Sequence, residues 1–432
     1  MAIKRRADAS GDTPSAVAGK PARRGRRTEI LRTAAAVIAS SGTRASIQGI
    51  ADAAGLSPGS LYHHFDSKEA ILVELMRDYH SDLERIAIEA RSSLEQPGSS
   101  TVADRVFELG AAIAKCALEH RAAVQMSLFQ APTAYPELNE LVQRKAVAVE
   151  EAMLQTLVAG RWSGYIRSDV SLGPLADRLC QTMLHAGLEH LGDGTRPEEV
   201  ARLLCTIHTI GLAAHPATDE VWDRSAALAA AAETIATWSE QPIADPDDKA
   251  ARIREAAREQ FGLKGYEVTT IRDIASAAGL ATGTVYQLIG PKEELLATIM
   301  RSFAEMVGEG WQAVLRSDSS PVEKLDALSW ININALQQFP DEFRIQLAWL
   351  RQTPPANINP GWLFVNRLDD MKVLLEEGIR IGDIRIDSPS TELLARCVID
   401  VQWIPENILR DAGRRGALIH ARDTVLRGVA AR

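Results

Sequence analysis

Six of the polar side chains within the twelve residues that run from 57 to 68 are candidates for a binding site. They carry hydroxyl, phenol, imidazole and ammonium groups, which can bond to phosphate oxygens and to base edges. They are Ser57, Ser60, Tyr62, His63, His64 and Lys68. The chain contains no phosphate-cradling glycine loop, no HExxH and no GxSxG nucleophile motif. The polar run therefore favours contact with nucleic acid, and the chain is predicted not to be an enzyme.

The polar run belongs to a segment that occurs twice. Residues 46–72 and 270–296 align without a gap at a displacement of 224, and 12 of the 27 aligned positions are identical. Internal repeats of this kind indicate a duplicated structural unit. We therefore expect each copy to position its polar groups on the same local scaffold.

Each copy is predicted to form two short helices joined by a tight turn. Apolar residues recur with helical spacing from Ile47 to Ala54, behind Ser46 as N-cap. Gly55 then ends this helix, and Ser57-Pro58 begins the next one. Thr270–Asp273 forms a capping box in the second copy. The pattern is typical of a helix-turn-helix whose second helix enters the major groove, and a second copy favours this over a plain helical hairpin.

The segment resembles the DNA-binding domain of TetR-type transcriptional repressors. The resemblance rests on Gly59–Phe65 and Ser67–Glu69, includes the helix from Arg27 to Ser41, and covers about 50 residues in each copy. It implies phosphate contacts for Tyr62, His64 and Lys68, and base contacts near the start of the recognition helix. The predicted DNA-binding residues of the first copy are Arg27, Ser46, Gln48, Ser57, Pro58, Gly59, Ser60, Tyr62, His63, His64 and Lys68.

The second copy departs from this pattern at its recognition helix. Leu288 stands where the first copy has His64, and Gly290-Pro291 replaces Asp66-Ser67. One phosphate contact is therefore missing from the second helix-turn-helix. Two alternatives remain: this segment still binds DNA, or it has become structural. Its predicted DNA-binding residues are Thr270, Arg272, Thr282, Gly283, Thr284, Tyr286, Gln287 and Lys292.

Composition and charge are those of a soluble globular protein with a basic arm. The length of 432 residues predicts two or three domains, with 46% hydrophobic and 24% charged residues. Residues 1–27 hold eight basic and two acidic residues, a net +6, so the overall charge of −9 leaves −15 on the remainder. A basic arm beside the first helix-turn-helix would orient the molecule on DNA through its electric field.

The sequence predicts neither a membrane span nor a metal site nor a cofactor. No apolar run reaches 18 residues, and the polar N-terminus lacks a signal-peptide core. The four cysteines lack metal or redox spacing, so we expect them to be buried as small apolar groups. A cytoplasmic protein that acts at the nucleoid is expected.

A second repeated motif extends the duplication beyond the two helix-turn-helix segments. The turn Gly164–Arg167 is matched by Gly382–Arg385 at a displacement of 218. Between the first head and this turn, one long helix is predicted over 136–158. We predict an all-α chain of two tandem TetR-like units. The predicted domains are a disordered basic arm at 1–24, a helix-turn-helix domain at 25–72, a helical regulatory domain at 73–238, a linker at 239–248, a second helix-turn-helix domain at 249–296 and a second helical regulatory domain at 297–432.

The tandem arrangement suggests a regulator, by default a repressor, with two non-identical heads on one chain. Dimeric helix-turn-helix proteins read two half-sites, so one chain could act as an intrachain pseudo-dimer on an asymmetric or composite operator. A dimer of such chains and a ligand- or protein-binding scaffold are the alternatives. The resemblance implies release of DNA by a small apolar effector. Its candidate contacts are Phe107, Met126, Phe129, Met183, Trp330, Phe343, Trp349, Trp362 and Trp403.

Overall fold

The predicted all-α class is confirmed. The computed structural model describes residues 19–41, 45–96, 100–128, 134–189, 196–239, 248–266, 268–351, 361–386, 388 and 390–431. These residues form helices α1 to α21, one π-helix (η2) and two isolated β-bridges. Within the same residues, no helix is long and apolar enough to cross a membrane. All four cysteines are buried, as expected from the sequence.

The first half of the chain consists of a small head and a taller helical body. The head is α1 (Gly19–Ser41), α2 (Ile47–Ala53) and α3 (Pro58–Tyr62). The body is α4 (Lys68–Glu95), α5 (Val102–Glu119), α6 (Arg121–Leu128), α7 (Pro136–Gln143), α8 (Val147–Trp162), α9 (Leu172–Glu189) and α10 (Pro197–Ile210). The long α4 belongs to both parts, because its first turn closes the head and the rest packs against α5 and α8.

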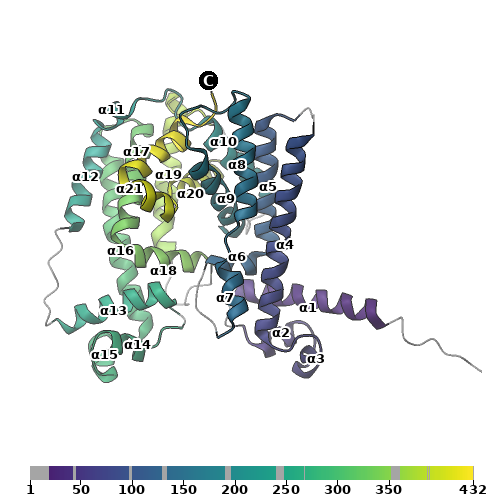
Figure 1. Ribbon diagram of the computed structural model, residues 1–432. Helices are drawn as coiled ribbons and strands as arrows, with labels where there is room; N and C mark the ends of the chain where they lie inside the picture. Colours follow the sequence, from purple (N-terminus) through teal and green to yellow (C-terminus); the bar gives the residue numbers. More distant parts are fainter. Residues whose placement is uncertain are drawn as a thin grey trace, which may run out of the picture.

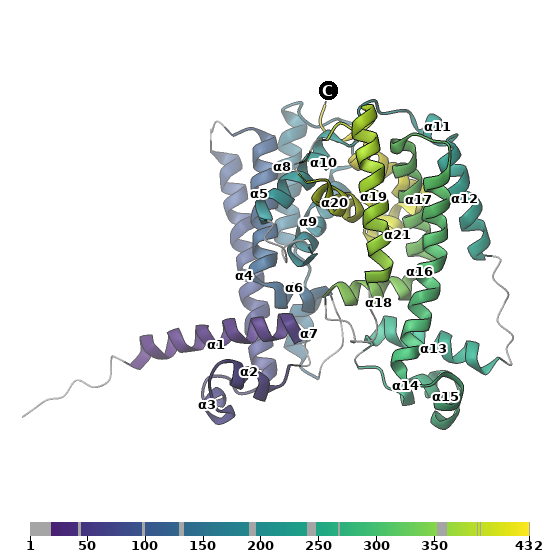
Figure 2. The ribbon, with the colours of Figure 1, turned by 180° about the vertical axis from the view of Figure 1, so that it is seen from behind.

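The second half repeats this order. Its head is α13 (Lys249–Lys264), α14 (Ile271–Ala277) and α15 (Thr282–Ile289). Its body is α16 (Lys292–Arg316), α17 (Pro321–Gln338), α18 (Pro340–Arg351), α19 (Gly361–Ile381), α20 (Thr391–Gln402), α21 (Glu406–Ala421) and η2 (Arg422–Arg427). Figures 1 and 2 show the halves side by side, with both heads at one end of the molecule and the C-terminus at the other.

The two halves are joined where the chain leaves α10 and η2. Gly211 ends α10 and Gly428 ends η2, both with positive φ (83° and 76°). The short segments after these glycines run beside each other and beside the turns at Ile166 and Ile384, with which they form the two isolated bridges.

Backbone hydrogen bonds cross this junction in four matched pairs. Each bond has a counterpart displaced by 217 or 218 residues with the halves exchanged, and all eight measure 2.7 to 3.0 Å. The same contact made once in each direction is the pattern of two-fold symmetry. The pairs are Leu212 N–Val425 O with Val429 N–His208 O, Ala213 N–Leu426 O with Ala430 N–Thr209 O, Ala214 N–Asp383 O with Ala431 N–Tyr165 O, and Arg385 N–Leu212 O with Arg167 N–Val429 O.

A connector of two helices links the halves. It comprises α11 (Asp219–Trp222) and α12 (Ala226–Ser239), and α12 packs on α16 and α17 of the second half. The predicted first regulatory domain, 73–238, therefore contains two helices that belong structurally to the second half. The reason is geometric: the first half ends far from the heads, so α12 must run back along the second body towards α13 (Figure 1).

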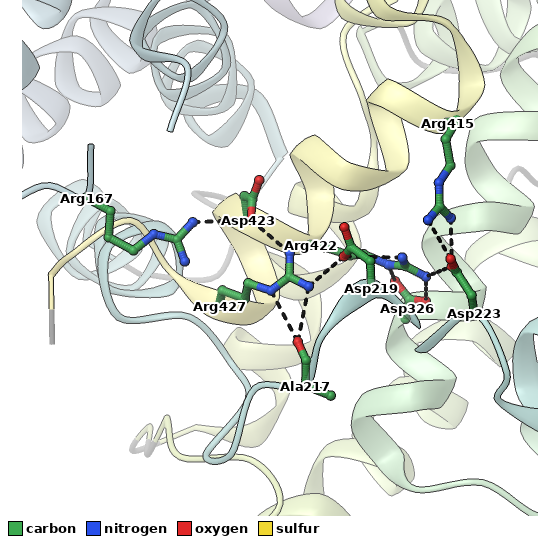
Figure 3. A network of polar contacts seen from close by, with 9 residues as sticks. All are labelled: Arg167, Ala217, Asp219, Asp223, Asp326, Arg415, Arg422, Asp423 and Arg427. Carbon is green, nitrogen blue, oxygen red and sulfur yellow. Dashed lines mark hydrogen bonds and ion pairs between the residues drawn. The ribbon is translucent and has the colours of Figure 1, made fainter. Parts of the chain in front are cut away.

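Buried ion pairs hold this connector in place (Figure 3). The Arg422 guanidinium, whose side chain is fully buried, makes two 2.8 Å hydrogen bonds to the Asp326 carboxylate. It also lies 2.9 Å from Asp223 and 3.4 Å from Asp219 of the connector. The guanidinium carbon of Arg422 lies 5.4 Å from the centroid of the Trp222 ring. A single charged network thus joins α11 to α17 and η2.

Two predicted boundaries are wrong. The predicted disordered arm, 1–24, overlaps α1, which begins at Gly19 because Pro21 is tolerated in a first turn and the following residues favour helix. The single helix predicted over 136–158 is two, since the chain leaves helical geometry at Arg144 and restarts after Ala146. Most of the predicted linker, 240–247, and residues 1–18 of the predicted arm lie outside the described residues.

Candidate nucleic-acid interface

The first head has the local geometry that the sequence predicts. The Ser46 hydroxyl accepts a hydrogen bond from Gly49 N (2.9 Å), and Gly55 ends α2 with a φ of 64°. Ser57 caps α3 by accepting from Ser60 N at 3.1 Å, with Pro58 in the first turn. The two helices are thus set by side-chain caps on either side of one left-handed glycine.

A packed core fixes the orientation of α3. Leu61 and Phe65 are buried, and the Arg27 guanidinium lies 4.0 Å from the centre of the Phe65 ring. Arg27 also pairs with Glu74 of α4 and donates to the backbone carbonyl of His64. In this structure Arg27 therefore ties α1 to the end of α3, and its predicted contact with DNA stays a prediction.

The remaining polar groups of α3 are directed outward. Tyr62 is 49% exposed, and Ser57, Gly59 and His63 are also exposed, while His64 is half-buried. Leu61 points into the core, whereas its neighbours on α3 are half-buried (Pro58 and Ser60) or exposed (Gly59 and Tyr62). The outer surface of α3 consequently brings together the predicted base and phosphate contacts at one lower corner of the molecule (Figure 1). Outside α3, Gln48 is exposed and Lys68, in the first turn of α4, is half-buried.

The second head keeps the scaffold. Thr270 and Asp273 form the predicted capping box, and Gly279 ends α14 with a φ of 65°. Val285 is fully buried, as Leu61 is in the first head. Arg252 donates to the Ala278 carbonyl (2.5 Å). Arg26 makes the matching bond to Ala54 at 3.2 Å in the first head.

The outer surface of the second head is more apolar. Tyr286, Gln287 and Leu288 are all exposed, Tyr286 at 56% and the apolar Leu288 at 47%. Lys292 donates to the backbone carbonyls of Tyr266 and Thr269 at 2.8 and 3.0 Å. Its ammonium is thus bonded to its own head in this structure. Arg272 and Gly283 are exposed, and Thr282 and Thr284 are half-buried.

The described residues predicted to contact an effector lie in or against the main apolar core, in both bodies. In the second body, Phe343 and Trp403 meet edge to face with 4.4 Å between their ring centroids, and Trp330 packs against both apolar clusters of that body. In the first body, Met126 and Met183 are buried, and Phe107 lies under the Arg202 guanidinium at 4.0 Å. The side chains of Phe129, Trp349 and Trp362 lie outside those that the structure describes.

Comparison with known proteins assigns both heads to one family. The sequence profile of "Bacterial regulatory proteins, tetR family" matches residues 30–75 and 253–299. The HTH-type transcriptional repressor KstR2 of Mycolicibacterium smegmatis is 26% identical over 166 residues, which cover 37% of this chain and 78% of that protein. KstR2 of Rhodococcus jostii is 49% identical over 72 residues, 16% of this chain and 35% of that one. The solved ketosteroid transcriptional regulator KstR2 of Mycobacterium tuberculosis is 22% identical, covers 43% of this chain and 97% of that chain, and has a TM-score of 0.37.

Proposed function

We propose, from the premise that the chain belongs to the tetR family of bacterial regulatory proteins, that its two halves act as the two protomers of a dimer. In this proposal one molecule is a complete DNA-binding transcriptional regulator. It places two heads on one operator, as a homodimer of a helix-turn-helix protein does. It acts in the cytoplasm, at the chromosome.

The observation that carries the proposal is the junction of matched hydrogen bonds. A contact made once in each direction is what an isologous dimer interface contains. Here Leu212 N bonds to Val425 O while Val429 N bonds to His208 O, at 2.8 and 3.0 Å. Both heads lie at the same end of the molecule, which supports simultaneous contact with one duplex (Figures 1 and 2).

The two heads differ in the side chains that face outward, so we expect an asymmetric operator. The pair His63-His64 in the first head stands opposite Gln287-Leu288 in the second. An amide and an imidazole hydrogen-bond different base edges, because each base pair presents its own pattern in the major groove. The half-sites should therefore differ in sequence.

Regulation by a small apolar effector is the second part of the proposal. The named relatives are transcriptional repressors, which supports repression here. An effector releases DNA when it binds more tightly to a body geometry that sets the heads at another spacing. A helical scaffold without DNA binding is the alternative, in which the exposed Leu288 marks a structural head.

Sizing the free protein by light scattering and then its complex with promoter DNA tests the proposal. One chain per duplex with an asymmetric footprint is the expected result. Two chains on a palindrome would contradict the pseudo-dimer. A Tyr62→Ala, Lys68→Ala variant that binds as tightly as the wild type would refute DNA contact through the first head.

A further inference from the structure

The two heads differ in the helix that precedes the recognition helix. Gln48 in the first turn of α2 corresponds to Arg272 of α14 at a displacement of 224. One turn further on, Asp52 corresponds to Ser276. In the first head, Gln48 Nε2 donates to Asp52 Oδ1 at 2.7 Å. In the second head, Arg272 and Ser276 are both exposed, and a serine brings no carboxylate to pair with the guanidinium. The second head thus presents a cation where the first presents an amide bonded within its own helix.

The stability of α14 does not account for this arginine. The first N–H groups of a helix carry partial positive charge, so a cation in the first turn is disfavoured. Arg272 lies in that turn, since α14 begins one residue before it. The neighbouring Asp273 carboxylate belongs to the capping box, where it accepts from Thr270 N at 2.8 Å and from Thr270 Oγ1 at 2.6 Å. A cation that the helix disfavours, exposed on a reading head, points to an anionic partner outside the chain.

The lysine at the start of α16 is held inside the second head. Lys292 Nζ donates to the carbonyls of Tyr266 and Thr269 at 2.8 and 3.0 Å, and it lies 4.1 Å from the centroid of the Tyr266 ring. Tyr266 is buried, and its hydroxyl donates to Glu293 at 3.0 Å. An ammonium group has three N–H donors, of which two are used here. A phosphate contact through Lys292 would therefore compete with bonds that it already makes.

These bonds fix the loop that leads into α14. Tyr266 and Thr269 both lie between the end of α13 and the N-cap of α14. The corresponding loop of the first head, 42–45, contains no aromatic residue, so the stack of ammonium on ring belongs to the second head. Lys292 consequently holds the start of α14, and with it the backbone from which Arg272 projects.

We propose that Arg272 makes the cationic phosphate contact of the second head and that Lys292 is a positioning residue for it. The first helix of a helix-turn-helix crosses the DNA backbone, so an exposed guanidinium on α14 lies beside phosphate groups. Both heads lie at one end of the molecule (Figures 1 and 2), and a guanidinium matches a phosphate in a two-bond fork. The assignment rests on the proposed function, because it requires that both heads bind one operator.

Salt dependence distinguishes the two residues. The full chain is titrated onto its footprinted operator at several salt concentrations. Arg272→Gln should lower the slope of log affinity against log salt by about 1, the change for one lost phosphate contact, whereas Lys292→Met should keep the wild-type slope. Arg380→Gln, at an exposed arginine of α19, is the matched control and should also keep it. A wild-type slope for Arg272→Gln, or a slope lowered by about 1 for Lys292→Met, overturns the assignment.

Amide hydrogen exchange of the free protein tests the positioning role. Lys292→Met should speed exchange in residues 265–273, because the loop loses two hydrogen bonds, and Arg272→Gln should not. This measurement needs no DNA, so it holds even for a variant that binds the operator too weakly for a slope. Equal exchange in wild type and Lys292→Met would contradict the positioning role.

Neutral phosphate analogues separate a phosphate contact from a base contact, since arginine also fits guanine O6 and N7. Single phosphates of the second half-site are replaced by methylphosphonates. At least one replacement should weaken binding of the wild type and cause no further loss in Arg272→Gln. If Arg272→Gln instead changes the preference for one base pair and no replacement behaves in this way, the contact is to a base and the proposal is refuted.

Failure of the proposed function would look different. A wild type that does not protect two half-sites refutes the proposed function, and this assignment with it. A wild type that protects both half-sites, with an unchanged slope for Arg272→Gln, refutes the assignment alone.

Discussion

Gly211 and Gly428 pack backbone to backbone where the two halves cross. A Cβ atom on Gly211 would lie 2.4 Å from the Arg427 carbonyl carbon, and one on Gly428 would lie 2.2 Å from that of Ile210. Both glycines also have positive φ. Each half thus leaves just enough room for the backbone of the other, and no side chain fits between them.

Gly211→Ala and Gly428→Ala should therefore weaken the junction. Each adds a clash with backbone, which cannot rotate away, to the strain of alanine at positive φ. Gly164→Ala is the matched control, because Gly164 has a φ of 76° and nothing within 4 Å of its Cβ position. We expect each junction variant to lose about 1–3 kcal/mol more than the control in urea unfolding. Equal losses in all three would contradict the close crossing.

Arg422→Met should destabilise the protein by about 3–5 kcal/mol, because it leaves the Asp326 carboxylate buried and unpaired. Asp326 is 1% exposed, and burial, opposed by Arg422, raises the pKa of its carboxyl. Chemical denaturation measures the loss. Arg410→Ala is the control, since its pair with Asp411 is exposed on both sides and worth little. A change as small as that of the control would show that the network does not hold the connector.

Stability should fall between pH 7.5 and 5.5 through two buried histidines. Burial lowers the pKa of His420 to about 3, with a further contribution from the Arg178 charge, and burial lowers that of His208 well below its usual value. The unfolded chain takes up these protons near pH 6.5, so this stabilisation is complete above pH 6.5 and is lost as the pH falls towards the folded pKa. The limiting slope is about 1.4 kcal/mol per pH unit for each histidine.

His420→Leu tests this assignment by urea unfolding at both pH values. The variant should lose less stability on acidification than the wild type, because only one of the two buried histidines, His208, remains to be protonated on unfolding. His215→Ala, at an exposed position, should behave like the wild type. An identical pH dependence in wild type and His420→Leu would exclude His420 as a source.

Each head should protect its own half of the operator. Tyr62→Phe with Lys68→Ala should remove protection of one half-site and lower the slope of log affinity against log salt by about 1 for each lost phosphate contact. Tyr286→Phe should affect the other half-site. Footprinting and anisotropy titrations at several salt concentrations measure both effects. Lys115→Ala, on the exposed surface of the body, is the control. If Tyr286→Phe leaves the protection of the second half-site unchanged, the result favours a purely structural role for the second head.

The heads could be predicted because their signals are local. Ser46, Ser57 and Thr270 cap helices through backbone N–H groups three residues ahead, and Gly55 and Gly279 end them in the left-handed region. Such contacts depend on neighbours in sequence, so pattern and spacing are enough to find them. The same holds for burial of Leu61 and Val285, which follows from helical periodicity.

The partners of charged residues could not be predicted in this way. Arg27 is predicted to contact DNA, and its partner Glu74 in this structure, 47 positions away, could not be read from the sequence. Lys292, the counterpart of Lys68 in the second head, is predicted to contact DNA, and in this structure it bonds to the backbone of Tyr266 and Thr269. A long cationic side chain reaches several neighbours, and which one it meets depends on how the helices pack.

The sequence by itself determined that the chain is helical, that it is duplicated, and where its reading heads lie, because repeats, caps and periodicity are properties of short segments. The tertiary structure alone decided how the halves join at Gly211 and Gly428, that α12 packs on the second half, and that Arg422 is buried against Asp326. These features bring together residues far apart in sequence, and their energies depend on burial and on distances in space.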